Sequence, residues 1–268
     1  MGIDIQKLSS KEHLDKLDQN SVLEILEDIP ESLIQFSANP ILNYCLEKKF
    51  GLKDKPSPRV LNNWVKNGLV KVDENDKGKV KRFDRLESIW LNIVVELRDF
   101  GLPLDSIART RKILFDYQLK GFSLFKFQVL NCILRKPQTL VVYKNGDARI
   151  LATEIYSKLL NKHQLSAHIN INLDEFIIPE FPRNLMSKDF KISNAFSSNE
   201  KLKMLYFLKT GDFQEMKVRL SQEDIRYVDK PILFEKSKDL QEILTKWSFE
   251  EILVTIDDES ETVILSKK

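Results

Sequence analysis

The feature that most constrains this chain is a duplication at its C-terminal end. The stretches Leu202–Lys230 and Leu240–Lys268 each read as a short helix followed by two β-prone runs around a polar turn. Their strand residues match in pairs 36 positions apart: Phe213/Phe249, Glu215/Glu251, Met216/Ile252, Val218/Val254 and Leu220/Ile256. One helix with one hairpin is too small to form a stable core alone. We therefore expect two helix-plus-hairpin repeats that pair their sheets or their helices around a pseudo-twofold axis.

The residues before the duplication predict a small α/β unit. In TLVVYKNGDARIL, β-forming residues lie on both sides of Asn145-Gly146, which is a strong short-range hairpin signal. A helical stretch follows, and SAHININLDEFI then alternates, with Ile169 and Ile171 on one face and Asn170 on the other. This alternation predicts a half-exposed strand.

A third pattern centres on the stretch SPRVLNNWVKNGLV. Ser57 is a good N-cap and Pro58 suits the first helical position, where its missing N–H costs nothing. Gly68 is the expected end of this helix.

Around this helix the chain predicts the order helix, helix, hairpin, helix, helix. The first helix is expected over Ile41–Phe50. The hairpin is expected from Leu69–Val72 and Lys79–Phe83. The last two helices begin at Asp84, which has capping-box spacing to Glu87, and at Pro103.

These elements resemble the winged-helix DNA-binding domain of the MerR family of transcriptional regulators. The matching residues are Trp64 with Gly68 and Leu69, then Lys81 and Phe83, then Leu97, Arg98 and Gly101, then Leu104 and Ile107. The resemblance covers about 70 residues and implies a sequence-specific regulator that binds double-stranded DNA. We expect a homodimer, because a single winged helix covers only a short half-site.

The candidate DNA-binding residues follow from the helix periodicity. Leu61, Trp64 and Val65 are expected to pack inward, with Trp64 as a core anchor. The outward face and the wing supply the candidates: Arg59, Asn62, Asn63 and Lys66 from the helix, and Lys79, Lys81 and Arg82 from the wing. Arginine suits guanine and asparagine suits adenine in the major groove, whereas the wing cations are expected to contact phosphates.

Charge is distributed unevenly along the chain. Residues 1–39 carry 3 basic and 8 acidic side chains, residues 40–120 carry 17 and 11, and residues 121–268 carry 22 and 21. The basic excess therefore lies in the segment with the MerR-like pattern, which favours an anionic partner. The acidic N-terminal helices are expected either to extend the packing or to cover the basic face when DNA is absent.

No residue pattern indicates an enzyme, a cofactor or a metal site. None of the 8 glycines belongs to a phosphate-binding loop. His163 and His168 lack a nearby cysteine, and Asp174 with Glu175 reads as a solvated pair in a turn. We therefore expect no catalytic residue.

The chain is expected to be cytoplasmic, without a signal peptide or a membrane span. Cys45 and Cys132 are expected to be buried thiols.

The expected fold class is α+β, a winged helix-turn-helix domain followed by small α/β units with a duplicated helix-hairpin module. The predicted division is 1–39 as an acidic helical extension, 40–120 as the winged helix, 121–195 as the α/β unit and 196–268 as the two repeats. Two alternatives to a regulator stay open. One is a protein-interaction adaptor that reuses the winged helix, since Asn62 and Asn63 stand where the family usually has arginine and tyrosine. The other is an architectural DNA binder of a mobile element. The sequence does not indicate whether a small-molecule effector is sensed.

Overall fold

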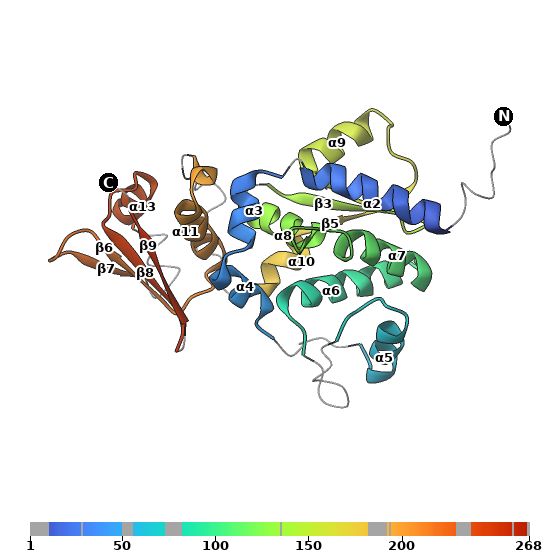
Figure 1. Cartoon of the computed structure of the whole chain (residues 1–268), viewed down its shortest axis with the longest axis horizontal. Helices are drawn as coiled ribbons and strands as arrows, with labels where there is room; N and C mark the ends of the chain where they lie inside the picture. The colour runs from blue at the N-terminus through green and yellow to red at the C-terminus, as the bar shows by residue number, and fades with distance from the viewer. Residues whose placement is uncertain are drawn as a thin grey trace. The chain divides into compact units, whose positions relative to one another are not determined.

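The computed structural model describes residues 11–27, 29–49, 56–72, 82–134, 136–181, 192, 194–228, 237–258 and 260–266. Over these ranges the protein is a mixed α/β chain with small antiparallel sheets (Figure 1), which agrees with the predicted class at this level. The helices are α2 (Lys11–Glu27), α3 (Glu31–Ser37), α4 (Pro40–Glu47), α5 (Pro58–Lys66), α6 (Arg85–Asp99), α7 (Leu104–Phe115), α8 (Leu124–Leu134), α9 (Thr153–Asn161), α10 (Asp174–Ile177), α11 (Asn199–Thr210) and α13 (Lys238–Thr245), with 3-10 turns η2 (Ile178–Glu180) and η3 (Ala195–Ser197). The strands are β1 (Gln118–Leu119), β2 (Phe122–Ser123), β3 (Gln138–Tyr143), β4 (Ala148–Ala152), β5 (His168–Asn172), β6 (Glu215–Arg219), β7 (Ile225–Val228), β8 (Glu251–Asp257) and β9 (Ser260–Leu265). None of the described helices has the length and apolar character needed to cross a bilayer.

The chain forms two compact units whose boundaries differ from the predicted division. The first unit lies within Met1–Pro30, Leu46–Cys132 and Lys136–Phe176. The second lies within Glu31–Cys45, Ile133–Arg135 and Ile177–Lys268. The acidic N-terminal region is therefore shared, with α2 in the first unit and α3 in the second.

The first unit is built on α6, α7, α8 and a three-stranded sheet of order β4-β3-β5. Trp90 on α6 is fully buried and packs edge-on against Phe115 and Phe125, with ring centroids 5.8 and 6.1 Å away. Both α7 and α9 pack against the sheet, and Figure 1 draws them on opposite sides of it. The hairpin, the helix and the alternating strand of the predicted α/β unit are confirmed.

The β3–β4 turn is fixed against α7. Gly146 has φ +82° and its N–H donates to Tyr143 O at 2.8 Å, so glycine closes a three-residue loop. Ser106 Oγ on α7 donates to Lys144 O, and Thr110 Oγ1 donates to Gly146 O, at 2.9 and 3.0 Å. A Cβ atom on Gly146 would lie 2.2 Å from Ser106 O, so only glycine permits this approach.

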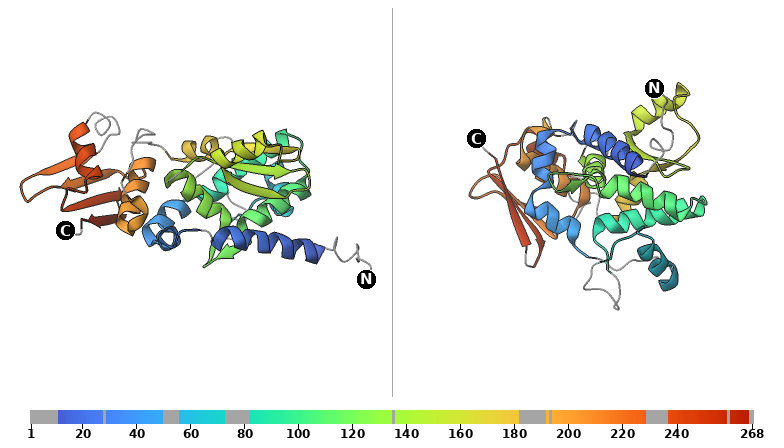
Figure 2. Two further views of the ribbon diagram at one scale, coloured as in Figure 1. Left: turned by 90° about the horizontal axis from the view of Figure 1, so that it is seen from above. Right: turned by 45° about the vertical axis from the view of Figure 1, so that its right-hand side comes forward.

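The second unit contains the predicted duplication as one four-stranded sheet of order β7-β6-β8-β9, drawn in orange and red in Figure 1 and Figure 2. The pairing of Met216 with Val228 in the first hairpin recurs 36 residues later as Ile252 with Ile264. Where the hairpins meet, Lys217 pairs with Leu253, again 36 positions away. When a residue pairs with its own repeat equivalent, a local twofold axis passes between the two, so the predicted pairing of the two sheets around a pseudo-twofold axis is confirmed.

Several element boundaries were not predicted. The first described helix, α2, is 17 residues long, and α4 ends at Glu47, before the predicted Phe50. The helix α8 was missed.

Both cysteines are buried free thiols, as predicted, and Cys132 Sγ donates to Asp174 Oδ1 at 2.7 Å. Asp174 is therefore not the purely solvated turn residue expected from the sequence.

Candidate DNA-binding helix

The helix α5 begins and ends at specific local signals. Val60 N–H donates to Ser57 Oγ at 3.4 Å, and Pro58 takes the first helical position, both as predicted. At the other end, Gly68 has φ +71°, its N–H donates to Val65 O, and Leu69 N–H donates to Trp64 O. These two bonds form a Schellman motif, which stops the helix and turns the chain inward.

One face of α5 is buried and the other is exposed. Leu61 and Trp64 are 6% and 5% exposed, which confirms the core role predicted for Trp64. Val65 is half-buried. The four candidate base-contacting residues of the helix are all exposed: Arg59, Asn62, Asn63 and Lys66.

Asn63 has polar contacts within its own helix. Asn67 Nδ2 donates to Asn63 Oδ1 at 3.0 Å and to Asn63 O at 2.7 Å. The carboxamide of Asn63 is therefore oriented by the end of its own helix. Asn62 and Arg59 lie on the earlier turns of the exposed face.

The segment that leaves α5 is attached to α6 by two side chains. Trp90 Nε1 donates to Leu69 O at 2.7 Å, and this bond is buried. Lys71 N–H donates to Glu87 Oε2 at 3.3 Å. On this segment the acceptor (Leu69 O) and the donor (Lys71 N–H) are both backbone atoms. The two side chains of α6 therefore fix the path of the chain after α5 independently of the side chains at positions 69 and 71.

Glu87 also joins α6 to α7 through a bidentate ion pair. Its oxygens accept from Arg111 Nη2 at 2.5 Å and Nη1 at 3.2 Å, and the two side chains are 12% and 4% exposed. Burial raises the pKa of Glu87, and the charge of Arg111 opposes that rise. Asp84 caps α6 as predicted by accepting from Glu87 N–H at 2.8 Å, but the Glu87 carboxylate is directed to Arg111 and Lys71. The capping-box prediction is therefore right for Asp84, while the role of Glu87 was missed.

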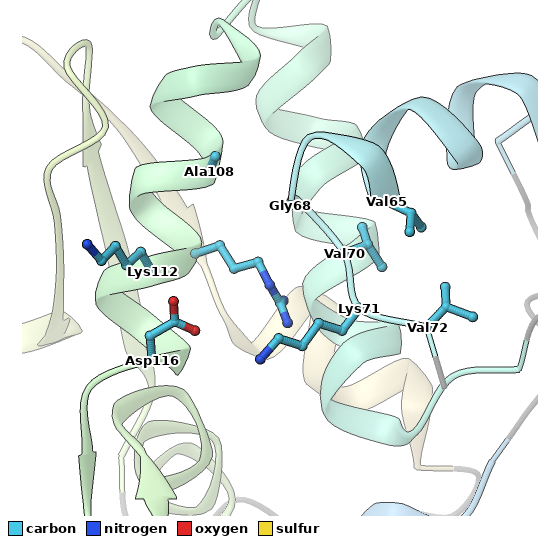
Figure 3. A pocket seen from close by; sticks show the side chains of 9 residues that line it. Val65, Gly68, Val70, Lys71, Val72, Ala108, Lys112 and Asp116 are labelled. Carbon is cyan, nitrogen blue, oxygen red and sulfur yellow. The ribbon is translucent and has the colours of Figure 1, made fainter. Parts of the chain in front are cut away.

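A pocket of about 340 Å³ lies between this segment and α7 (Figure 3). One wall carries Lys112 and Asp116, and Lys71 extends toward α7 from the other. The complete lining is Val65, Gly68, Val70, Lys71, Val72, Ala108, Arg111, Lys112 and Asp116. The pocket therefore combines three cations and one carboxylate with valine side chains.

The predicted wing falls mostly outside the described residues. Lys79 and Lys81 both lie there. Arg82 is described and exposed, and Phe83 beside it is 2% exposed. Leu69–Val72, predicted as the first strand of the wing, has no strand conformation in the described part.

The acidic helix α2 packs on α7. Asp18 accepts from Arg109 Nη2 at 2.8 Å and from Nε at 3.1 Å, and this hydrogen bonding raises the pKa of Arg109. Lys112 Nζ lies 2.7 Å from Asp15 Oδ1, and that bond raises the pKa of Lys112. These carboxylates neutralise cations of α7 rather than the exposed face of α5.

Comparisons with protein-family models, curated proteins and solved structures find no match to this chain. Within the described ranges, no group of three or more His, Cys, Asp or Glu side chains is arranged to hold a metal ion.

Proposed function

We propose that this protein is a sequence-specific, double-stranded DNA-binding transcriptional regulator that reads bases with α5 through a MerR-like winged helix. A cytoplasmic location and a homodimeric state are part of the proposal. The observation that carries it is the two-sided character of α5. Its apolar side is anchored by Leu61 and Trp64, while Arg59, Asn62 and Lys66 are exposed together.

A recognition helix has to be presented rigidly, because base readout depends on side-chain geometry. The buried Trp90–Leu69 bond and the Glu87–Lys71 bond supply that rigidity on the C-terminal side of α5. The resemblance of the surrounding residues to the MerR family and the basic excess of residues 40–120 support the same proposal.

The first experiment is selection of bound duplexes from a random pool by the full-length protein, at low and at physiological salt. We expect enrichment of an inverted repeat, because two copies of one helix read two half-sites. Salt-sensitive binding without enrichment would instead indicate an architectural DNA binder. No binding at low salt would contradict the proposal and favour the adaptor.

Substitutions then test the assigned face. Replacing Arg59 or Asn62 by Ala is expected to weaken binding to the selected DNA site by about 1–3 kcal/mol. It should also relax the base preference at one position of that site. Replacing Lys81 by Ala is expected to weaken binding to every duplex alike. It should also lower the slope of log binding constant against log salt concentration by about 1. Lys158→Ala on α9, an exposed cation in the same unit, is the control and should leave binding unchanged. Unchanged binding in all variants would mean that another face contacts DNA.

A further inference from the structure

The outer face of the β6–β9 sheet exposes a group of large apolar side chains. Alternate residues of each strand point to opposite faces, and Met216, Val218, Ile252, Val254 and Ile264 form the buried inner face. On the outer face, the edge strands expose Tyr227 (55%), Ile225 (44%), Val263 (42%) and Leu265 (54%). These side chains form two apolar pairs, one on each edge strand of the face, and exposed apolar patches mark contact surfaces.

Charged residues occupy the two central strands of this face. Arg219, Lys217 and Glu215 lie on β6, where Lys217 Nζ is 3.1 Å from Glu215 Oε2, and Glu251 lies on β8. Arg219 Nη2 is 2.9 Å from Glu251 Oε2, and the two side chains remain 42% and 30% exposed. One row across the four strands is Ile225, Arg219, Glu251, Leu265, and the next is Tyr227, Lys217, Leu253, Val263.

The first of these rows matches the same row of a second copy read in the opposite direction, from β9 to β7. From β7 to β9 it reads apolar, basic, acidic, apolar. When a second copy is laid face to face about a twofold axis parallel to the strands, β7 lies over β9 of the other copy and β6 lies over β8. Arg219 of each copy then faces Glu251 of the other, and Ile225 of each copy faces Leu265 of the other. A twofold axis perpendicular to the strands would place like charges together.

We propose that a second copy of this chain packs on the outer face of the β6–β9 sheet, with the twofold axis along the strands. Aligned sheets pack about 10 Å apart with strands within about 30° of each other, which suits this arrangement. The face of four short strands is small for a stable interface, so we expect dissociation in the micromolar range without DNA.

This inference deepens the proposed function, since a dimer of this kind supplies the two α5 helices that an inverted repeat needs. Its test measures association without DNA. Failure of DNA binding and failure of dimerisation are therefore separate outcomes.

The test is sedimentation equilibrium of the full-length protein up to about 100 µM, a range that covers weak interfaces. The wild type is expected to dimerise. Arg219→Glu and Glu251→Arg are each expected to weaken the dimer by about tenfold or more, because each places like charges opposite one another across the interface. An equimolar mixture of the two variants is expected to restore association, since each then meets its complement.

The experiment with the mixture distinguishes a contact between two copies from a contact within one chain. In both single variants the internal Arg219–Glu251 pair is lost, and mixing cannot rebuild it. Restored association therefore requires contact between copies. Arg226→Glu is the matched control, because Arg226 is also 42% exposed but lies in the row of Val218 on the inner face.

A further variant tests the apolar edge. Leu265→Asp is expected to abolish the dimer, whereas Ile155→Asp, at 50% exposure on α9, is not. A wild type that stays monomeric overturns the proposal and leaves the face to a different protein. A dimer that is insensitive to Arg219→Glu and Leu265→Asp, or that mixing fails to restore, overturns it as well.

Discussion

Arg111 in the first unit and Arg226 in the second each hold a carboxylate, but in different surroundings. The Arg111 side chain is 4% exposed and bridges two helices through Glu87, which also accepts the backbone N–H of Lys71. Arg226 pairs with Asp224, two residues before it, and with Asp239 on α13 at 3.4 Å, and the three side chains are 42%, 44% and 70% exposed. The Arg111 pair connects two helices in a buried place, whereas both pairs of Arg226 lie at the solvent-exposed surface.

The difference indicates where charge contributes to structure. A buried pair is expensive to desolvate, and breaking it leaves a buried charge, so its geometry strongly constrains the helices that carry it. An exposed pair is screened by water and contributes little unless another surface covers it. The path of the chain after α5 therefore depends on the buried Trp90–Leu69 bond and on the Glu87 side chain that Arg111 holds, whereas the charged pairs of the sheet are exposed to solvent.

Arg111→Met should have the largest effect on stability. It leaves the Glu87 carboxylate buried without its guanidinium, and the expected loss is about 3–5 kcal/mol in urea unfolding. The deficit should shrink as the pH falls, because burial raises the pKa of Glu87 and a protonated carboxyl costs less to bury.

The control for this prediction is the double variant Arg111→Met with Glu87→Met, which removes both charges. It should recover most of the lost stability, because no buried charge is left. A loss below about 1 kcal/mol for Arg111→Met alone would contradict the assigned role of the buried pair.

Gly146→Ala should have the next largest effect. The new Cβ would lie 2.2 Å from Ser106 O, and the left-handed backbone adds strain, giving an expected loss of about 2–5 kcal/mol. Gly121→Ala is the matched control, since Gly121 has φ +83° but no atom within 4 Å of the Cβ position. Equal losses for the two variants would show that the approach of the turn to α7 has no energetic weight.

The sequence predicts those features whose signals are local. Ser57, Pro58 and Gly68 bound α5 correctly because caps act over a few residues. The duplication was found because paired strands require the same alternation in both copies. Trp64 was assigned to the core from its position on one helix face.

Features that depend on distant partners were not predicted. α8 was missed because it is buried on many sides and has no polar stripe, so that even Lys126 and Gln128 are 7% exposed. The partner of Arg111 is 24 residues away, and that of Cys132 is 42 away. No periodicity connects residues at such separations. The proposed base contacts of α5 stay predictions for the same reason, since they depend on a partner molecule.

Lys126→Met should have a smaller effect, of opposite sign. Burial lowers the pKa of Lys126 to about 8 from 10.5, although the charge of Glu47 opposes the shift, so the unfolded chain binds more protons between these values. The destabilisation is complete below about pH 8 and fades as the pH rises toward 10.5. We expect Lys126→Met to gain about 1–3 kcal/mol at pH 7 and much less at pH 10.

Thermal unfolding at the two pH values checks this prediction, with the exposed Lys158→Met as control. The lysine ammonium also lies 4.1 Å from the Phe122 ring centre, a contact that methionine replaces in part with its own side chain. A gain that is equal at both pH values would mean that packing, rather than charge, is responsible.

Arg226→Gln should have the smallest effect and gives the sharpest contrast with Arg111→Met. Because the pairs of Arg226 with Asp224 and Asp239 are both exposed, their loss should shift Tm by no more than about 1 °C. The same variant should leave the dissociation constant of the dimer unchanged, since Arg226 lies in the row of the inner face. A large fall in Tm would show that exposed pairs of the sheet do stabilise it. In that case a damaged sheet would also explain the weaker association of Arg219→Glu. Only restored association in the mixture with Glu251→Arg would then identify a contact between copies.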